Sequence, residues 1–260
     1  MDILLTNDDG YESPGIHSLA DGLASLGTVT IVAPAEDQSA IGRAYDGDIT
    51  ITERNRGYEV TGTPVDAVVT GIECLDINPD IVISGCNTGA NMGGHAIGRS
   101  GTISAAVEAT FFSIPSIAVS LHIPQPLWPI DPEPGHFTNA RKATAYLVEA
   151  TCEHSLFSQG DYLNVNVPFS PVFPIKMRVT RPSTFYDMAV NRDGNRILIQ
   201  DKTWDDFENG AINEAPDTDR GAVHEGVISV SPLSAPQESV ASESLETIAE
   251  RFQLIESAAE

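Results

Sequence analysis

Residues 2–10 read DILLTNDDG, an apolar run that ends in two adjacent carboxylates and a glycine. The run at 3–5 predicts a short buried β-strand. Next, PGIHSLADGLASL (14–26) places apolar residues at helical spacing behind Ser13, a suitable N-cap, and VTIVA (29–33) predicts a second buried strand. A strand, a helix and a strand within about thirty residues form a βαβ unit. This stretch therefore predicts a parallel sheet.

The rest of the chain continues this alternation, beginning with two short segments that predict a hairpin, at 48–52 and 58–61. Further helices are expected at 64–75, 102–112, 136–154 and 242–255, and further strands at 81–84, 116–121, 162–167, 175–180, 196–200 and 226–233. We predict a single α/β domain: a Rossmann-like, doubly wound, mostly parallel sheet with an extended C-terminal β-rich arm and a terminal helix. The core and the active site are expected within 1–125, while 126–260 complete the core and carry oligomerisation elements.

The chain is strongly acidic, with 37 Asp and Glu against 14 Lys and Arg and a formal net charge of −23. Such a charge repels a nucleic-acid duplex at long range, so we expect no duplex partner. A small phosphorylated substrate can still bind, because a divalent cation inverts the local field. The acidic residues are spread along the whole chain. This favours adaptation to concentrated salt over a dedicated acidic binding face.

Compartment and membrane signals are also informative. No run of about 18 apolar residues predicts a membrane span, and the N-terminus lacks the basic region and cleavage site of a secretory signal. The three cysteines, Cys74, Cys86 and Cys152, form no CxxC pair. Reduced thiols are the simplest interpretation of an odd number. We expect a cytoplasmic protein with no membrane partner.

Polar side chains follow three of the expected parallel strands, whose carboxyl ends meet at one edge of the sheet. They are Asn7, Asp8 and Asp9 after the first strand, Gln38 and Ser39 after the second, and Ser84, Asn87, Thr88 and Asn91 after the third. Carboxylate, hydroxyl and amide oxygens suit Mg²⁺ or Mn²⁺, whereas zinc favours His or Cys. The pattern predicts a site for one such cation.

Each of these features also has a purely structural interpretation. An Asp-Asp-Gly sequence is by itself more often a turn with a helix N-cap, and the glycine-rich segment 85–100 can be a simple bend. Ser100, Gly101 and Thr102 can be only a helix start, although helix N-termini also bind phosphate. The convergence of oxygen ligands at one edge favours the cation site, because unrelated turns do not require it.

Five stretches resemble the SurE (survival protein E) family of nucleotidases. They are TNDDGYESPGI (6–16), VAPAEDQSAIG (32–42), GTPVDAV (62–68), PDIVISGCNTGANMGG (79–94) and SGTISAAVEATFFSIPSIAVS (100–120). Weaker matches at NVNVP, VTRPS, RDGNR and GVISVSPL extend the resemblance over nearly the whole chain.

The resemblance implies a Rossmann-like core with one divalent cation per subunit, Mg²⁺ or Mn²⁺. It also implies hydrolysis of nucleoside 5′-monophosphates, with 3′-monophosphates as further substrates. The metal ligands of the family match Asp8, Asp9, Ser39 and Asn87, and Asp8 and Asp9 are the catalytic residues. Whether Asp8 acts as base, nucleophile or ligand alone stays open. For the phosphate, the expected contacts are Asn7, Asn91, Ser100, Gly101 and Thr102.

Two stretches depart from the family pattern. Ala35, Glu36 and Asp37 stand where the second loop usually carries a basic residue, and His95 and Arg99 stand in a stretch that usually holds an acidic pair and a tyrosine. The metal ligands survive both changes. The partners of the phosphate and the preferred nucleotide therefore stay open, as does Arg99, which can contact phosphate or pair with a surface acid.

Three other functions were weighed against a phosphatase. A response-regulator receiver needs an Asp at the end of its third strand and a later Lys, but here that strand ends in Ser84 and no lysine precedes Lys142. A non-catalytic nucleotide-binding module is the closer alternative. It has no need of two carboxylates at its phosphate site, since uncompensated carboxylates repel the ligand. A scaffold role leaves the polar edge unexplained.

The C-terminal part predicts an assembly. Apolar residues in 177–200 lie on both sides of RDGN (192–195), a hairpin-like turn. A two-stranded arm is marginal alone in water, and its edges invite pairing with another chain. Docking on a neighbouring subunit, which the family resemblance also implies, is favoured over an arm folded back on its own core. We expect a homodimer or a homotetramer.

The acidic composition makes stability depend on salt. We expect a lower melting temperature in dilute buffer and its recovery at molar KCl, because screening removes the repulsion between the carboxylates. Calorimetry from low to molar KCl measures this dependence. A melting temperature that does not change over that range would argue against salt adaptation.

Overall fold

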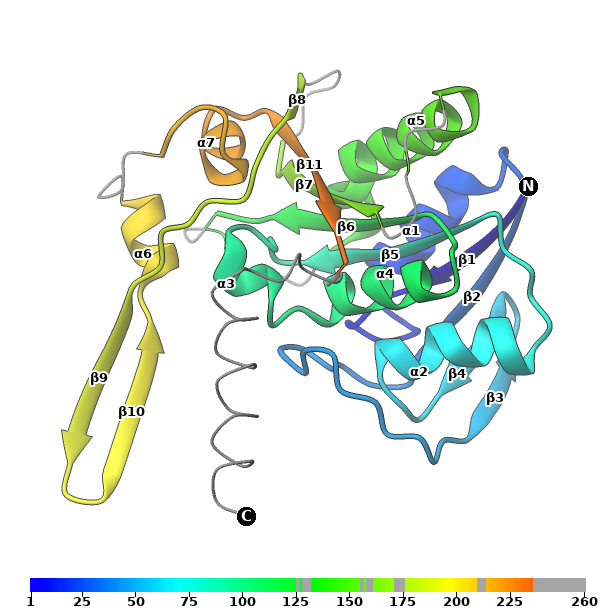
Figure 1. Ribbon diagram of the computed structural model, residues 1–260, viewed down its shortest axis with the longest axis horizontal. Coiled ribbons are helices and arrows are strands. Elements are labelled where there is room, and N and C mark those ends of the chain that lie inside the picture. Colours follow the sequence, from blue (N-terminus) through cyan, green and yellow to red (C-terminus); the bar gives the residue numbers. More distant parts are fainter. Residues whose placement is uncertain are drawn as a thin grey trace, which may run out of the picture.

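A nine-stranded sheet runs through the molecule, with helices packed on both faces (Figure 1). The computed structural model describes residues 1–124, 127, 132–154, 157, 161–170, 176–209 and 214–235. Across the sheet lie, in order, β3 (Ile51–Arg54), β4 (Gly57–Val60), β2 (Thr28–Pro34), β1 (Asp2–Thr6), β5 (Ile81–Thr88), β6 (Ser116–His122), β7 (Asp161–Pro168), β11 (Ile228–Ser234) and β8 (Met177–Val179).

The order of the strands reverses between β1 and β5. All neighbours from β4 to β7 pair in parallel, while β3 is antiparallel to β4 and β11 is antiparallel to β7. From β1 the chain first builds outward through β2 to β4 and then returns to build β5, β6 and β7 on the other side. This confirms the doubly wound prediction and places the topological switch point at the carboxyl ends of β1 and β5.

Two pairs of helices cover the faces of the sheet. On one face lie α1 (Pro14–Leu23) and α5 (Thr138–His154), and on the other lie α2 (Pro64–Val69) and α4 (Gly101–Phe111). Alternate side chains of β1 point into the two layers: Ile3 and Leu5 into the core beneath α1, and Leu4 into the core beneath α2 and α4. Full burial of each such side chain stabilises the fold by roughly 1.5–3 kcal/mol.

Shorter elements complete the chain. They are a π-helical turn at Thr70–Cys74, α3 (Gly94–Ile97), a 3-10 turn at Pro134–Phe137, β9 (Met188–Asp193), β10 (Arg196–Asp201), α6 (Thr203–Glu208) and α7 (Asp219–His224). β9 and β10 pair only with each other, as an antiparallel hairpin that extends away from the main sheet (Figure 1). Among the described residues no helix is both long and apolar enough to cross a bilayer.

Most expected elements are present, although several begin or end at other residues than expected. The first helix ends at Leu23 rather than at residue 26, and a turn closed by the Leu26 N–H on the Leu23 carbonyl leads from it into β2. β5 continues to Thr88 rather than ending at Ser84, because after a bulge its residues resume pairing with β6. Asn87 therefore lies in a strand and not in a loop. The expected terminal helix at 242–255 lies outside the described residues.

Candidate active site

The acidic pair lies at the switch point of the sheet. Asp8 and Asp9 follow the last residue of β1, and Asn87 lies near the end of the neighbouring strand β5. The N-terminus of α4 approaches the same point, because a Cβ on Gly101 would lie 2.8 Å from the Cβ of Asp8. Three of the segments predicted from the sequence to form the site therefore meet at one place.

Asp8 is held by the first turn of α4. Its side chain is buried, with 3% of the residue exposed, and its Oδ1 accepts a hydrogen bond of 2.5 Å from the Thr102 hydroxyl. Ser100 is the N-cap of α4, and its hydroxyl accepts from the Ile103 N–H at 3.1 Å. Gly101 leaves room for the carboxylate that a larger residue would displace. The helix start thus fixes the position of Asp8.

Asp9 faces the end of β5. Its Oδ2 accepts a hydrogen bond of 2.8 Å from the Thr88 N–H, which ties the loop after β1 to the neighbouring strand. Burial, together with the charge of Asp8, raises the pKa of Asp9 to about 7. Burial also raises the pKa of Asp8, against the opposing effect of the hydrogen bonds from Thr102. A nearby cation would offset the cost of keeping both carboxylates ionised.

The loop after β2 comes to the same site. Its Gln38 N–H donates to the Asp8 carbonyl at 2.7 Å. The exposed Ser39 hydroxyl donates to the Asp37 carboxylate at 2.6 Å. The charge of Asp37 contributes to the raised pKa of both Asp8 and Asp9, so a third carboxylate lies near the pair. Sequence reasoning noted Asp37 only as a departure from the family pattern and missed this placement.

Asn87 and Asn7 each use their amide NH₂ locally. Asn87 donates to the Gly89 carbonyl at 2.6 Å and Asn7 to the Gly10 carbonyl at 2.9 Å. The side-chain carbonyl oxygen of Asn7 is buried and has no hydrogen-bond partner among the described residues. The same holds for the hydroxyls of Thr6 and Ser84, which lie opposite each other on β1 and β5. Unpartnered polar oxygens therefore lie beneath the acidic pair.

Asn91 lies in a buried polar network beside the site. Its side-chain NH₂ donates to the Ser120 hydroxyl at 3.0 Å, and its backbone N–H donates to Asn166 Oδ1 at 2.8 Å. The Asn91 carbonyl accepts from the side chains of Asn164, at 2.9 Å, and Asn166, at 3.1 Å. Sequence reasoning missed these three partners. The available signal was the alternation of Asn and Val in NVNVP, which is unusual for a strand buried on both faces.

His95 contacts two residues at the base of the β9–β10 hairpin. Its ring stacks on Tyr186 with the ring centroids 5.2 Å apart, and its Nδ1 lies 3.9 Å from Asp201 Oδ2. Both partners flank the β9–β10 hairpin. This departure from the family pattern is thus matched by contacts with the C-terminal part of the chain.

The donor set at the switch point is rich in oxygen. In the part of the chain that the structure describes, no three His, Cys, Asp or Glu side chains gather as a metal-binding group. The switch point instead brings together the Asp8 and Asp9 carboxylates, the Thr102 hydroxyl and, directly before Asp8, the unpartnered amide oxygen of Asn7. Hard divalent cations commonly bind through one or two carboxylates and retain water, so these residues suit such a cation.

Comparison with known proteins identifies the family of the chain. The family model described as "Survival protein SurE" matches residues 3–187. The chain belongs to the SurE family. It is 47% identical to the 5′-nucleotidase SurE of Haloarcula marismortui, over 96% of this chain and 95% of that one. It is 46% identical to the 5′-nucleotidase SurE of Natronomonas pharaonis, over 97% and 100%.

A solved SurE structure confirms the fold. The crystal structure of the SurE protein from Aquifex aeolicus matches with a TM-score of 0.79 at 30% identity, and the match covers 97% of this chain and 100% of that one. The SurE resemblance and the α/β fold expected from the sequence are therefore confirmed. Both Haloarcula and Natronomonas are halophilic archaea, in agreement with the salt adaptation inferred from the acidic composition.

The contact between Gly101 and Asp8 can be tested directly. We expect Gly101→Ala to lower phosphatase activity by roughly 10- to 100-fold, because the added methyl group must displace the Asp8 carboxylate. The nearest atom is the Cβ of buried Asp8, so the melting temperature should fall as well, and activity is compared well below it. Gly98→Ala is the matched control, since its Cβ would meet no atom closer than 3.6 Å. Equal activity in the two variants would contradict the tight packing.

Proposed function

We propose that the chain is a divalent-cation-dependent 5′-nucleotidase that releases phosphate from nucleoside 5′-monophosphates, with 3′-monophosphates as further substrates. The observation that carries this proposal is the convergence of Asp8, Asp9 and the start of α4 at the switch point of a SurE sheet. The relatives in Haloarcula and Natronomonas are both named 5′-nucleotidases, which supports the same activity here.

One divalent cation per subunit, Mg²⁺ or Mn²⁺, fits the residues present. Asp8, Asp9, Ser39 and Asn87 are the proposed ligands. The pKa values of Asp8 and Asp9 are raised by burial, so the ionised pair lacks a compensating charge from the protein itself. A bound cation would supply that charge. It would also polarise a phosphoryl oxygen and acidify a bound water.

The chain's own groups would orient the phosphate. We propose contacts from Asn7, Asn91, Ser100, Gly101 and Thr102, since the N-terminus of α4 carries a partial positive charge beside the acidic pair. The Thr102 hydroxyl donates to Asp8, so Thr102 also keeps the carboxylate in one orientation. Phosphoryl transfer depends mainly on positioning and on neutralising charge, and this arrangement provides for both.

A non-catalytic nucleotide-binding module is not favoured. Buried Asp8, half-buried Asp9 and the nearby Asp37 would repel a phosphate unless a cation lies between them and the phosphate. Once a cation is bound at this edge, the groups needed for hydrolysis lie beside the phosphate. The family relationship points to the same enzyme activity.

Asp9→Asn tests the proposed activity. We expect a loss of roughly 100-fold or more in Mn²⁺- or Mg²⁺-dependent hydrolysis of nucleoside 5′-monophosphates and p-nitrophenyl phosphate, because one of two charged ligands is removed. The amide oxygen can still accept the hydrogen bond from the Thr88 N–H. Burial disfavours the ionised carboxylate, so the cation-free variant should melt no lower than the wild type.

Asp80→Asn is the matched control for this experiment. Asp80 accepts a hydrogen bond from the N–H of Asp2, the first residue of β1. It therefore lies at the amino end of this strand, opposite to the end that leads to the acidic pair. We expect its activity to match the wild type, and EDTA to abolish the activity of both proteins. An Asp9→Asn protein that hydrolyses nucleotides like the wild type would overturn the site assignment.

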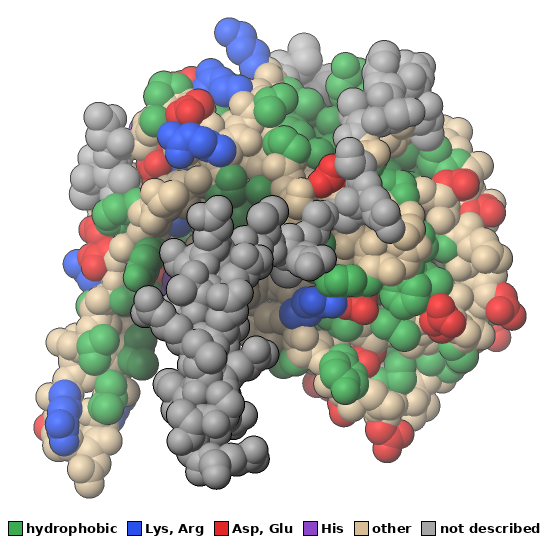
Figure 2. Space-filling view, viewed as in Figure 1, with side chains coloured by type: hydrophobic (Ala, Val, Ile, Leu, Met, Phe, Trp, Pro, Cys, Tyr) green, Lys and Arg blue, Asp and Glu red, His purple; other side chains and the backbone are tan. Residues whose placement is uncertain are grey.

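We also propose that the chain assembles through its arm into a homodimer or a homotetramer. Val190, Ile197 and Ile199 lie on one face of the β9–β10 hairpin, and 63%, 59% and 64% of their surface is exposed. Figure 2 shows hydrophobic side chains along the arm, apart from the main body. An isolated two-stranded hairpin is marginal in water, so this face is suited to burial against another copy.

Ile199→Glu tests the assembly. We expect light scattering of the wild type at tens of micromolar in molar KCl to give at least twice the 27.7 kDa mass of one chain. The glutamate would place a charge in the buried contact and shift the protein towards the monomer. Gln200→Glu adds the same charge on the opposite face of the hairpin and should leave the mass unchanged. A monomeric wild type would exclude the proposal.

A further inference from the structure

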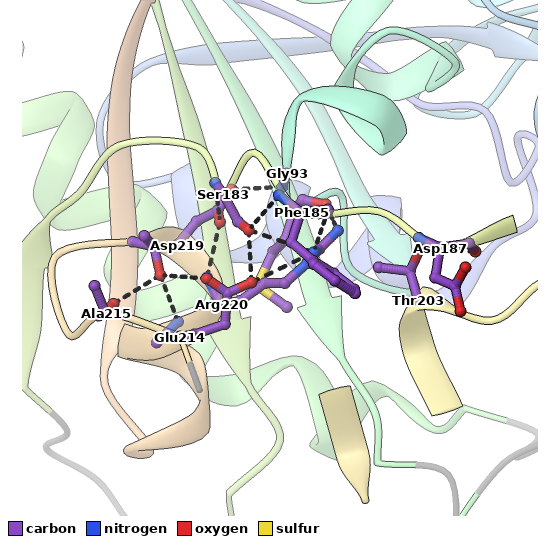
Figure 3. Close-up of polar contacts among 12 residues, drawn as sticks. Gly93, Ser183, Phe185, Asp187, Thr203, Glu214, Ala215, Asp219 and Arg220 are labelled. Carbon is purple, nitrogen blue, oxygen red and sulfur yellow. Dashed lines mark hydrogen bonds and ion pairs between the residues drawn. The ribbon is translucent and has the colours of Figure 1, made fainter. Parts of the chain in front are cut away.

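A buried arginine joins the C-terminal part of the chain to the loop that follows Asn87. Arg220 lies at the start of α7, and only 1% of the residue is exposed. Its guanidinium donates through Nη2 to the Met92 carbonyl at 3.2 Å and through Nη1 to the Phe185 carbonyl at 2.8 Å (Figure 3). One side chain thus holds the backbone of two segments.

Asp219, the residue before Arg220, binds the same two segments by accepting hydrogen bonds from their N–H groups. Asp219 is fully buried. Its Oδ2 accepts from the Gly93 N–H at 2.7 Å, and its Oδ1 accepts from the Ser183 N–H at 2.9 Å (Figure 3). The Ser183 carbonyl in turn accepts from the Gly94 N–H at 2.9 Å. The loop and the segment leading to the arm are therefore joined at several points.

Close packing around Met92 and Gly93 fixes the position of this part of the loop. Gly93 has a φ of +79°, and a Cβ on it would lie 2.5 Å from Arg220 Nη2. Met92 is buried against Phe207 of α6 and Val223 of α7. Charge is compensated locally, because Glu214 Oε1 lies 3.4 Å from Arg220 Nη1. Charged hydrogen bonds of this kind are strong when buried, and the planar guanidinium suits two separate carbonyls.

Met92 and Gly93, which are held by Asp219 and Arg220, lie close in sequence to the proposed cation site. Met92 directly follows Asn91, whose own backbone is held by Asn164 and Asn166, and it lies five positions after the proposed ligand Asn87. The loop 89–93 is thus fixed at one end by β5, which contains Asn87, and at the other by Asp219 and Arg220. Release of the second end would loosen this loop, which follows Asn87 and carries Asn91.

We propose that Asp219 and Arg220 are positioning residues for the cation and phosphate site. They hold residues 92 and 93 against the segment that leads to the β9–β10 hairpin. In this way they fix the loop that follows the proposed ligand Asn87 and carries Asn91, and they link the hairpin to the site. This inference rests on the proposed cation-dependent activity. It adds residues that lie outside the proposed ligands and more than 125 positions from the loop they hold.

Arg220→Met in the full-length protein tests this role. We expect the affinity for Mn²⁺ to fall about tenfold or more. Affinity is measured by electron paramagnetic resonance, in which the signal of free Mn²⁺ decreases on binding. We expect kcat to fall by a similar factor, because the loop no longer holds the ligand side chains in place. The melting temperature is measured in parallel, and all titrations are made well below it.

Arg178→Met is the matched control. Arg178 donates to the Pro216 carbonyl and to Glu225, both at 2.8 Å, so it braces the same C-terminal region without touching the loop. We expect its Mn²⁺ affinity and kcat to match the wild type. An Arg220→Met protein that is folded and binds Mn²⁺ as tightly as Arg178→Met would overturn the inference.

Arg220→Lys keeps the test decisive if the methionine variant does not fold. Lysine retains the charge but has a single nitrogen, which cannot span the carbonyls of Met92 and Phe185 in the same way. We expect this variant to bind Mn²⁺ more weakly than the wild type. Its melting temperature should change less than that of Arg220→Met. Wild-type affinity in this variant would overturn the inference. A wild-type protein that binds no Mn²⁺ would instead overturn the proposed function.

Discussion

The crowding of two adjacent carboxylates, Asp8 buried and Asp9 half-buried, is the constraint on which the rest of the site depends. Asp8 and Asp9 cannot move apart, since they are consecutive residues between β1 and a tight loop, and each is held by a hydrogen bond from a different neighbour. Burial raises the pKa of both. An isolated buried carboxylate is costly, so the fold carries a local instability that a cation can relieve. Glycine at position 101 fits this crowding, because a Cβ there would lie 2.8 Å from the Cβ of Asp8.

The doubly wound order of the strands makes this arrangement possible. Because β1 and β5 are neighbours that lead away in opposite directions, their following loops diverge and leave an opening above the sheet. The hydrogen bond from the Thr88 N–H to Asp9 joins β5 to the loop after β1 at this opening. The loop after β2 is joined to the same place by the hydrogen bond from the Gln38 N–H to the Asp8 carbonyl. The site is therefore built from groups whose relative positions are set by backbone pairing rather than by long side chains.

Much of this could be predicted from sequence, for reasons that particular residues make clear. The apolar runs of β1 and β2 and the N-cap Ser13 define the βαβ unit locally, and the acidic pair follows a strand end directly. The network around Asn91 was harder to predict, although Asn164 and Asn166 interrupt an apolar strand. Asp219 and Arg220 could not be found in this way. Their partners are backbone groups of Met92 and Gly93, which carry no side-chain signature, and they lie far away in the chain.

The contacts of Asp219 and Arg220 with residues 92 and 93 also affect the order in which the molecule is completed during synthesis. The acidic pair leaves the ribosome among the first ten residues, and β5 follows within the first ninety. The side chains that secure the intervening loop are made more than 125 residues later than the backbone they hold. Since chains emerge from the N-terminus, a nascent chain can form the parallel core and expose its carboxylates well before the loop is secured. A chain that ends before residue 219 lacks Asp219 and Arg220, and it also lacks β11, which pairs with both β7 and β8.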